Sequence, residues 1–102
     1  MGSLDAIYSG LIRLHILYHA SKESIFGLAI IEELGRHGYK LSAGTLYPLL
    51  HGLEREGYLS SFEQRNGRHS RRLYKATPKG RKALREAKSK VRELFAELFE
   101  DM

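Results

Sequence analysis

The dipeptide Asn66-Gly67 constrains the fold most, because it stands between two short β-type runs in a chain whose other segments have helical spacing. Asn-Gly at the centre of two such runs is the strongest short-range sign of a β-hairpin. We therefore expect residues 58–76 to form two antiparallel strands joined by a two-residue turn. Centring that turn on Asn66-Gly67 places Leu59 opposite Tyr74 at the base of the hairpin.

Apolar residues before the hairpin recur at steps of three and four, which is the period of a helix. This spacing predicts three helices, over residues 4–19, 25–37 and 42–57. Ser24 and Ser42 are suitable N-cap residues for the second and third helices. The expected elements before the hairpin are therefore three helices in succession.

Pro48 interrupts the third expected helix six positions after its cap. Proline in a helix interior removes one backbone donor and costs about 3 kcal/mol. Two interpretations remain open on the sequence alone. Either the helix begins near Tyr47, or it begins after Ser42 and tolerates the proline.

A fourth helix is expected after Thr77-Pro78, which supply an N-cap and a proline at the first helical position. Its apolar residues follow a heptad spacing and extend beyond what a small domain can cover. We therefore expect two parts: a domain at 1–78 and a dimerisation helix at 79–102. Folding of that helix back onto the first helix is the alternative. The expected dimer interface comprises Leu11, His15, Leu84, Ala87, Val91, Leu94, Phe95, Leu98 and Phe99.

The charge is concentrated in one segment of the chain. The 102 residues carry a net charge of +5, but residues 65–92 hold twelve Lys and Arg against the single acid Glu86, a net +11. A basic block of this density favours a polyanionic partner such as nucleic acid. The alternative is a solvated basic helix face.

Residues for catalysis or cofactor binding are sparse. Cysteine is absent, which excludes disulfides and thiol chemistry. His15 and His19 have the i, i+4 spacing at which two imidazoles can share a metal, but no third ligand is evident. We therefore expect no enzyme activity, no catalytic residue, no metal and no cofactor. The longest apolar runs are also far too short for a membrane span.

Three helices followed by a hairpin with a basic tip is the order of a winged helix-turn-helix. The expected fold class is mostly α with a two-stranded β wing, followed by a C-terminal dimerisation helix. In such folds the second helix of the turn motif lies in the DNA major groove, and the hairpin contacts the backbone or the minor groove.

Specific motifs strengthen this interpretation. The run from Gly38 to Leu50, with Gly-Thr-Leu-Tyr-Pro at 44–48, resembles the signature of the PadR family of transcriptional regulators. The segments at 24–27 and 71–80 resemble the family's entry to the second helix and its passage from the hairpin to the last helix. The similarity spans about residues 10–80, and the single terminal helix resembles the family's short subfamily.

The resemblance implies a homodimeric repressor that binds a palindromic operator in double-stranded DNA. It also implies a cytoplasmic, nucleoid-associated protein of a bacterium or archaeon. Some short members bind flat aromatic compounds between the subunits through a Trp, and this chain has none. Because the Trp is absent, the resemblance alone does not decide whether a small aromatic effector binds at the dimer interface. The alternative function is a winged-helix module that binds protein or RNA without operator specificity.

The residues expected at DNA fall into two groups. The start of the third helix would enter the major groove, where Thr45 is the candidate for a base contact and Lys40 and Tyr47 for phosphate contacts. The hairpin would meet phosphates or a narrow minor groove. The full expected set is Lys40, Ser42, Ala43, Gly44, Thr45, Tyr47, Arg65, Arg68, His69 and Arg71.

Overall fold

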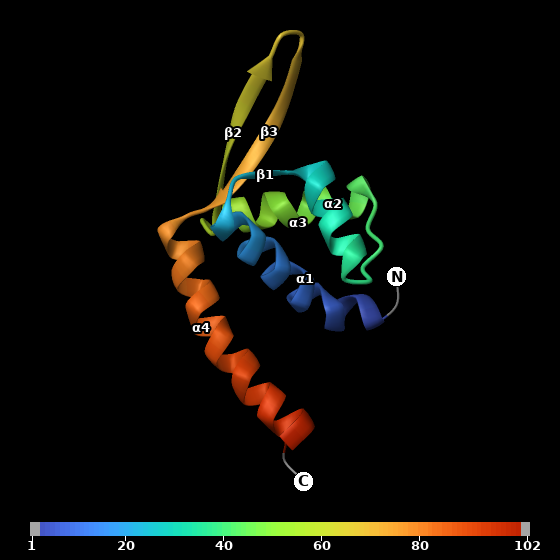
Figure 1. The fold of residues 1–102 in the computed structure, drawn as a ribbon, viewed down its shortest axis with the longest axis vertical. Coiled ribbons are helices and arrows are strands. Elements are labelled where there is room, and N and C mark those ends of the chain that lie inside the picture. Colours follow the sequence, from blue (N-terminus) through green and yellow to red (C-terminus); the bar gives the residue numbers. More distant parts are fainter. Residues whose placement is uncertain (1–2, 101–102) are drawn as a thin grey trace.

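Four α-helices and three short strands form the winged helix-turn-helix of this computed structural model, which describes the backbone of residues 3–100 and the side chains of residues 6–100. The predicted fold class is confirmed. In chain order (Figure 1), the elements are α1 (Ser3–Lys22), β1 (Ile25–Phe26), α2 (Gly27–Arg36), α3 (Ala43–Arg55), β2 (Leu59–Asn66), β3 (His69–Ala76), α4 (Pro78–Phe95) and the π-helical turn η1 (Ala96–Glu100).

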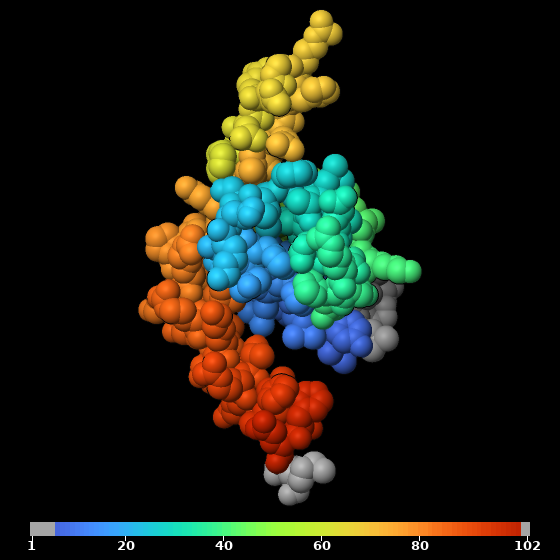
Figure 2. Space-filling view, viewed as in Figure 1, coloured from blue at the N-terminus to red at the C-terminus, as the bar shows by residue number. Residues whose placement is uncertain are grey.

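The helices α1, α2 and α3 form the body of the molecule, and two elements project from it. The hairpin of β2 and β3 extends from one end, and α4 extends toward the other (Figures 1 and 2). The molecule is accordingly elongated, with extents of 57 × 31 × 22 Å. Among residues 3–100, no helix combines the length and the apolar character that a membrane crossing requires.

The hydrophobic core lies where the three helices of the body meet the base of the sheet. Each helix directs its apolar stripe inward, as the spacing predicts. Burial of such side chains is the main favourable contribution to folding. The core comprises Ile12, Ile16, Leu17, Ala20, Ile30, Leu34, Leu46, Leu50, Leu53, Leu59, Tyr74 and Ala76.

Two predicted N-caps are confirmed. The Ser42 hydroxyl accepts a hydrogen bond from the Thr45 amide at 3.3 Å, and the Thr77 hydroxyl accepts one from the Gly80 amide at 3.0 Å. Helix α3 therefore begins directly after Ser42 and contains Pro48, which decides between the two interpretations of that residue.

The start of α4 is fixed to the turn between α3 and β2. The Thr77 amide donates to the Tyr58 carbonyl at 3.0 Å, and the Thr77 hydroxyl donates to the Gly57 carbonyl at 2.5 Å. Gly80 lies against Tyr58 so closely that any side chain at position 80 would overlap the Tyr58 carbonyl group. The absence of a Cβ there allows α4 to begin beside the body.

The predicted start of the second helix is wrong. Ile25 and Phe26 are extended and pair with β3, so that the sheet has three strands in the order β1-β3-β2. Helix α2 begins at Gly27, with Phe26 rather than Ser24 in the N-cap position. Pairing with β3 satisfies backbone groups at 25 and 26 that a helix would otherwise have used.

The predicted register of the hairpin is also wrong, by two residues. The central turn residues are Gly67 and Arg68, and Leu59 lies opposite Ala76, while Tyr74 lies opposite Ser61. Gly67 has a φ of 66°, whereas no residue other than glycine has a positive φ in the described chain, so Arg68 does not. A positive φ at the first turn residue alone, with glycine there, is typical of a type II′ turn.

Cross-strand pairing explains why this register is favoured. It places Phe62 opposite Leu73 and Glu63 opposite Arg72, whereas the predicted register would place Phe62 opposite an arginine. Apolar pairs and opposite charges across strands each stabilise a hairpin by about 0.2–1 kcal/mol. Because side chains alternate with period two, the shift leaves every side chain on the expected face.

Candidate nucleic-acid interface

The first turn of α3 is exposed, whereas the remainder of the helix is anchored in the core. Residues 42–45 (Ser42, Ala43, Gly44 and Thr45) are all exposed, and Leu46 and Leu50 behind them are fully buried. The free amides at a helix N-terminus attract anions, and small side chains allow a close approach to phosphate or base edges. Lys40 is exposed in the connection that precedes this turn and adds a positive charge.

Tyr47 has a different environment from the rest of the predicted set. It is half-buried and packs against the hydrophobic core. Its phenol ring lies against Gly27, the first residue of α2. Tyr47 therefore joins α3 to α2, in addition to any contact it makes with a ligand.

The tip of the hairpin presents cations to the solvent. Arg65, Arg68 and His69 are exposed, and none of them forms an ion pair with an acidic side chain among residues 6–100. Arg71 is held more firmly, because its guanidinium lies 4.3 Å from the centre of the Phe26 ring and donates to the Gln64 amide oxygen at 3.4 Å. The hairpin thus carries unpaired positive charge at its tip.

Arg72 links the hairpin to α3, a role that the sequence did not indicate. Its guanidinium donates to the Ser61 hydroxyl at 2.9 Å, and Ser61 donates to Glu54 Oε2 at 2.6 Å. Glu54 lies on α3, so this chain of hydrogen bonds fixes the base of the hairpin to that helix. Ser61 and Arg72 are diagonal neighbours across the hairpin, and the predicted register would have placed them directly opposite each other. The contact that the sequence did not indicate is the one between Ser61 and Glu54, because it depends on how α3 packs against β2.

The predicted dimer residues divide along α4. Leu84 and Ala87 are partly buried beside the domain, and Leu84 packs against its core. From residue 91 onward every described side chain is exposed, and the far end of α4 is clear of the body in Figure 2. The exposed apolar residues of this part are Val91, Leu94, Phe95, Leu98 and Phe99, of which the last two lie in η1.

A groove of about 850 Å³ runs between α1, the end of α2 and α4. Its apolar walls include Leu11 and Tyr18 of α1 and Val91 and Phe95 of α4. Leu11 is 42% exposed, and His15 is partly buried at the same groove. Leu11 and His15, the two residues of α1 in the predicted dimer interface, therefore lie on the face of α1 that lines this groove opposite α4.

His15 lies among other imidazoles in this groove. Its ring is stacked on that of His37 with the centroids 4.5 Å apart, and the His19 ring is 6.3 Å away. Burial lowers the pKa of His15 below its usual value, and the nearby His37 and His19 lower it further, while Glu33 opposes them. His37 was not singled out from the sequence, because eighteen positions separate it from His19.

Comparison with known families gives a match over most of the chain. The model of the "Transcriptional regulator PadR-like family" matches residues 16–86, which include α2, α3 and both strands of the hairpin. The transcriptional regulator Rv3488 of Mycobacterium tuberculosis is 47% identical over 87 residues, covering 85% of this chain and 81% of that protein.

Solved structures agree with this match. A PadR-like transcription factor from Bacteroides fragilis superposes with a TM-score of 0.84 at 27% identity, covering 98% of both chains. A PadR family regulator from Eggerthella lenta superposes with a TM-score of 0.83 at 28% identity, covering 96% of this chain and 87% of the other. The similarity therefore includes the terminal helix as well as the winged domain.

Proposed function

Since the chain belongs to the PadR-like family of transcriptional regulators, and is thereby a DNA-binding regulator, we propose that it is a homodimeric repressor that binds a palindromic operator. The observation that carries the proposal is the exposed first turn of α3, on a helix that is anchored in the core by Leu46, Leu50 and Leu53. A rigid helix with a free N-terminus is the element that helix-turn-helix proteins place in the major groove.

In this proposal α3 supplies the sequence-specific contacts. Thr45 points from an exposed turn and offers both a hydroxyl and a methyl group, which suits an adenine edge or a thymine methyl. Lys40 and Tyr47 flank that turn and contact phosphates. The contacts made by the helix backbone at Ser42, Ala43 and Gly44 position the helix on the duplex.

The hairpin supplies affinity that depends little on sequence. Arg65, Arg68 and His69 carry no competing acidic partner among the described side chains, so an approaching phosphate meets charges that are not already neutralised. Each cation that contacts a phosphate releases counterions and makes binding dependent on salt. Arg71, held on the Phe26 ring, adds a charge in a fixed position.

The exposed end of α4 supports a dimer. Leu94 is 47% exposed and Phe95 is 51% exposed. Both lie in the last turns of α4, the helix that extends away from the body (Figure 1). Burial of one such side chain contributes roughly 1.5–3 kcal/mol, so several per subunit can offset the cost of association. The groove beside α1 has a volume in the range of small-molecule sites, which supports a small aromatic effector as a second ligand of this interface.

Sedimentation equilibrium and mobility-shift titration test the proposal together. We expect a dimer at micromolar concentration that shifts a limited set of genomic duplex fragments in the presence of excess competitor DNA. A protein that sediments as a monomer, or that binds all fragments equally, contradicts it. Stronger binding to single-stranded RNA than to duplex DNA would instead identify an RNA-binding module.

A further inference from the structure

Three histidines from two helices converge at the groove between α1 and α2. His15 and His19 lie one turn apart on α1, and His37 caps the C-terminus of α2. One ligand nitrogen from each imidazole lies within 4.8 Å of the other two. The i, i+4 spacing on α1 already predicts that His15 and His19 lie side by side. The packing of α2 on α1 adds His37 as the third imidazole.

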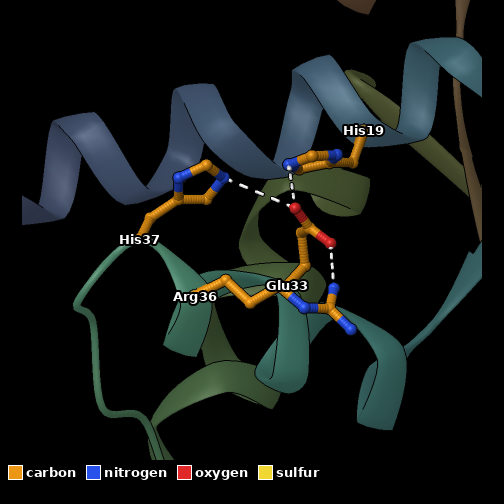
Figure 3. A network of polar contacts seen from close by, with 4 residues as sticks. All are labelled: His19, Glu33, Arg36 and His37. Carbon is orange, nitrogen blue, oxygen red and sulfur yellow. Dashed lines mark hydrogen bonds and ion pairs between the residues drawn. The ribbon is translucent and has the colours of Figure 1, made fainter.

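A carboxylate stands beside these imidazoles. Glu33 Oε2 lies 3.4 Å from His37 Nε2 and 3.8 Å from His19 Nε2 (Figure 3). The other carboxylate oxygen, Oε1, is paired with the Arg36 guanidinium at 2.5 Å. Arg36 therefore holds the carboxylate with one oxygen directed toward the histidines, which is how a metal-binding carboxylate is commonly oriented by its own partner.

One of the imidazole nitrogens lacks a partner. His19 Nε2 is buried, and its 3.8 Å separation from Glu33 is too long for a hydrogen bond, so among the described residues this atom has none. Buried polar atoms without a partner are uncommon, and each calls for an explanation such as an ion or a water. A cation bound between the imidazoles would satisfy this nitrogen.

We propose that His15, His19, His37 and Glu33 form a binding site for one divalent transition-metal ion such as Zn²⁺. Three imidazoles and one carboxylate match the nitrogen and oxygen ligands that Zn²⁺ takes in a tetrahedral site. Ligands at about 2.0–2.1 Å from the ion lie about 3.3 Å from one another. The 3.4 Å and 3.8 Å separations of Glu33 from His37 and His19 are close to that spacing. The three imidazole nitrogens lie within 4.8 Å of one another, so rotation of these side chains toward a common ion, His15 included, would complete the site.

A metal ion in this site would couple the groove between α1, α2 and α4 to α3, the helix proposed to bind DNA. This extension rests on the proposed function. His15 and His19 line the groove, and His37 opens the connection that leads to the Ser42 cap of α3. Tyr39 in this connection lies edge-on to His15, with the ring centroids 5.5 Å apart. An ion that joins His37 to α1 would restrict this connection and thereby change how α3 is presented.

Metal titration of the full chain, freed of any affinity tag and stripped with chelator, tests the site itself. Zn²⁺ is titrated by calorimetry and Co²⁺ by visible absorption, and we expect one ion per chain with the absorption of a tetrahedral complex. His37→Gln should weaken Zn²⁺ binding at least tenfold, and Glu33→Gln should weaken it less. His37 has a side chain that is 41% exposed, so its replacement leaves the apo fold intact, which circular dichroism verifies.

His51→Gln is the matched control, because His51 is exposed on α3 and lies outside the cluster. It should bind Zn²⁺ as the wild type does. A wild type that binds no ion, or a His51→Gln variant that loses as much affinity as His37→Gln, overturns the site.

Operator binding by fluorescence anisotropy tests the coupling separately. We expect the operator Kd of the wild type to differ at least threefold between the Zn²⁺-loaded and metal-free protein, and the Kd of His37→Gln not to respond. Stoichiometric Zn²⁺ binding without a change in Kd overturns the coupling. Stoichiometric Zn²⁺ binding by a protein with no affinity for duplex DNA contradicts the proposed function and supports the metal site alone.

Discussion

The phenol ring of Tyr47 lies against the backbone of Gly27, so closely that a Cβ atom at position 27 would come within 2.7 Å of the ring carbon Cζ. This contact joins the start of α2 to the N-terminal half of α3. The orientation of the exposed first turn of α3 therefore depends on the absence of a side chain at residue 27.

Gly27→Ala should destabilise the protein by about 1–3 kcal/mol, because the new methyl group must displace Tyr47 in a packed environment. Gly35→Ala is the control within the same helix, since nothing lies within 4 Å of a Cβ at position 35. Replacing an unobstructed helical glycine should stabilise the protein by roughly 0.5–1 kcal/mol. Urea unfolding of both variants measures the two changes, and changes of the same sign would show that the Tyr47 contact is unimportant.

Thr45→Ala should weaken operator binding by about 1 kcal/mol, or roughly fivefold, and reduce the preference over unrelated duplex. The side chain is exposed, so the loss reflects contacts with DNA rather than with the core. Thr45→Ser keeps the hydroxyl and removes the methyl group. If Thr45→Ser behaves like Thr45→Ala, the methyl group makes the contact, and unchanged affinity and selectivity in both variants would place Thr45 away from the bases.

Arg68→Ala should weaken binding to all duplexes alike and reduce the slope of log K against log salt by about 0.9, the contribution of one phosphate contact. Arg68 is exposed in the turn of the hairpin. Arg13→Ala removes the same charge from α1 and should leave the slope unchanged. Titrations at several salt concentrations give the slopes, and equal slopes for the wild type and Arg68→Ala would exclude this contact.

Leu94→Glu combined with Phe95→Glu should produce a folded monomer that binds the operator weakly. Both side chains are exposed in a single chain, so the charges disturb the dimer rather than the core. Leu28→Glu is the matched control, because Leu28 is 67% exposed on α2 and outside the predicted interface. Sedimentation distinguishes the species, and a double variant that remains dimeric would place the interface elsewhere.

Most of the fold follows from local signals in the sequence. The caps at Ser42 and Thr77 and the Asn-Gly pair of the hairpin are local signals, so the presence of α3, the start of α4 and the existence of the hairpin could be predicted. The local pattern leaves the start of α3 open between Ser42 and Tyr47, and the turn is centred one residue later than predicted, on Gly67 and Arg68. The pairing of Ile25 and Phe26 with β3 could not be predicted, because it joins segments nearly fifty residues apart and replaces a locally plausible helix start.

The site shows the same division between local and distant contacts. Exposure of the first turn of α3 follows from a polar cap ahead of an apolar stripe. The register of the hairpin depends on which cross-strand pairs are more favourable. The link from Arg72 through Ser61 to Glu54 depends in addition on the packing of α3 against β2, which no local pattern specifies. His37 joins His15 and His19 only through the packing of α2 on α1, which the i, i+4 spacing on α1 does not specify.

Selection of binding sites from a random duplex library by the wild-type protein tests the central claim most directly. A homodimer that inserts one α3 per subunit should enrich a two-fold symmetric sequence whose half-sites are centred about 10 base pairs apart or a multiple of that distance. The same enriched duplex should lose its advantage when Thr45→Ala replaces the wild type. Recovery of a single unpaired half-site, or no enrichment over the input library, would contradict a dimeric regulator that reads its operator through α3.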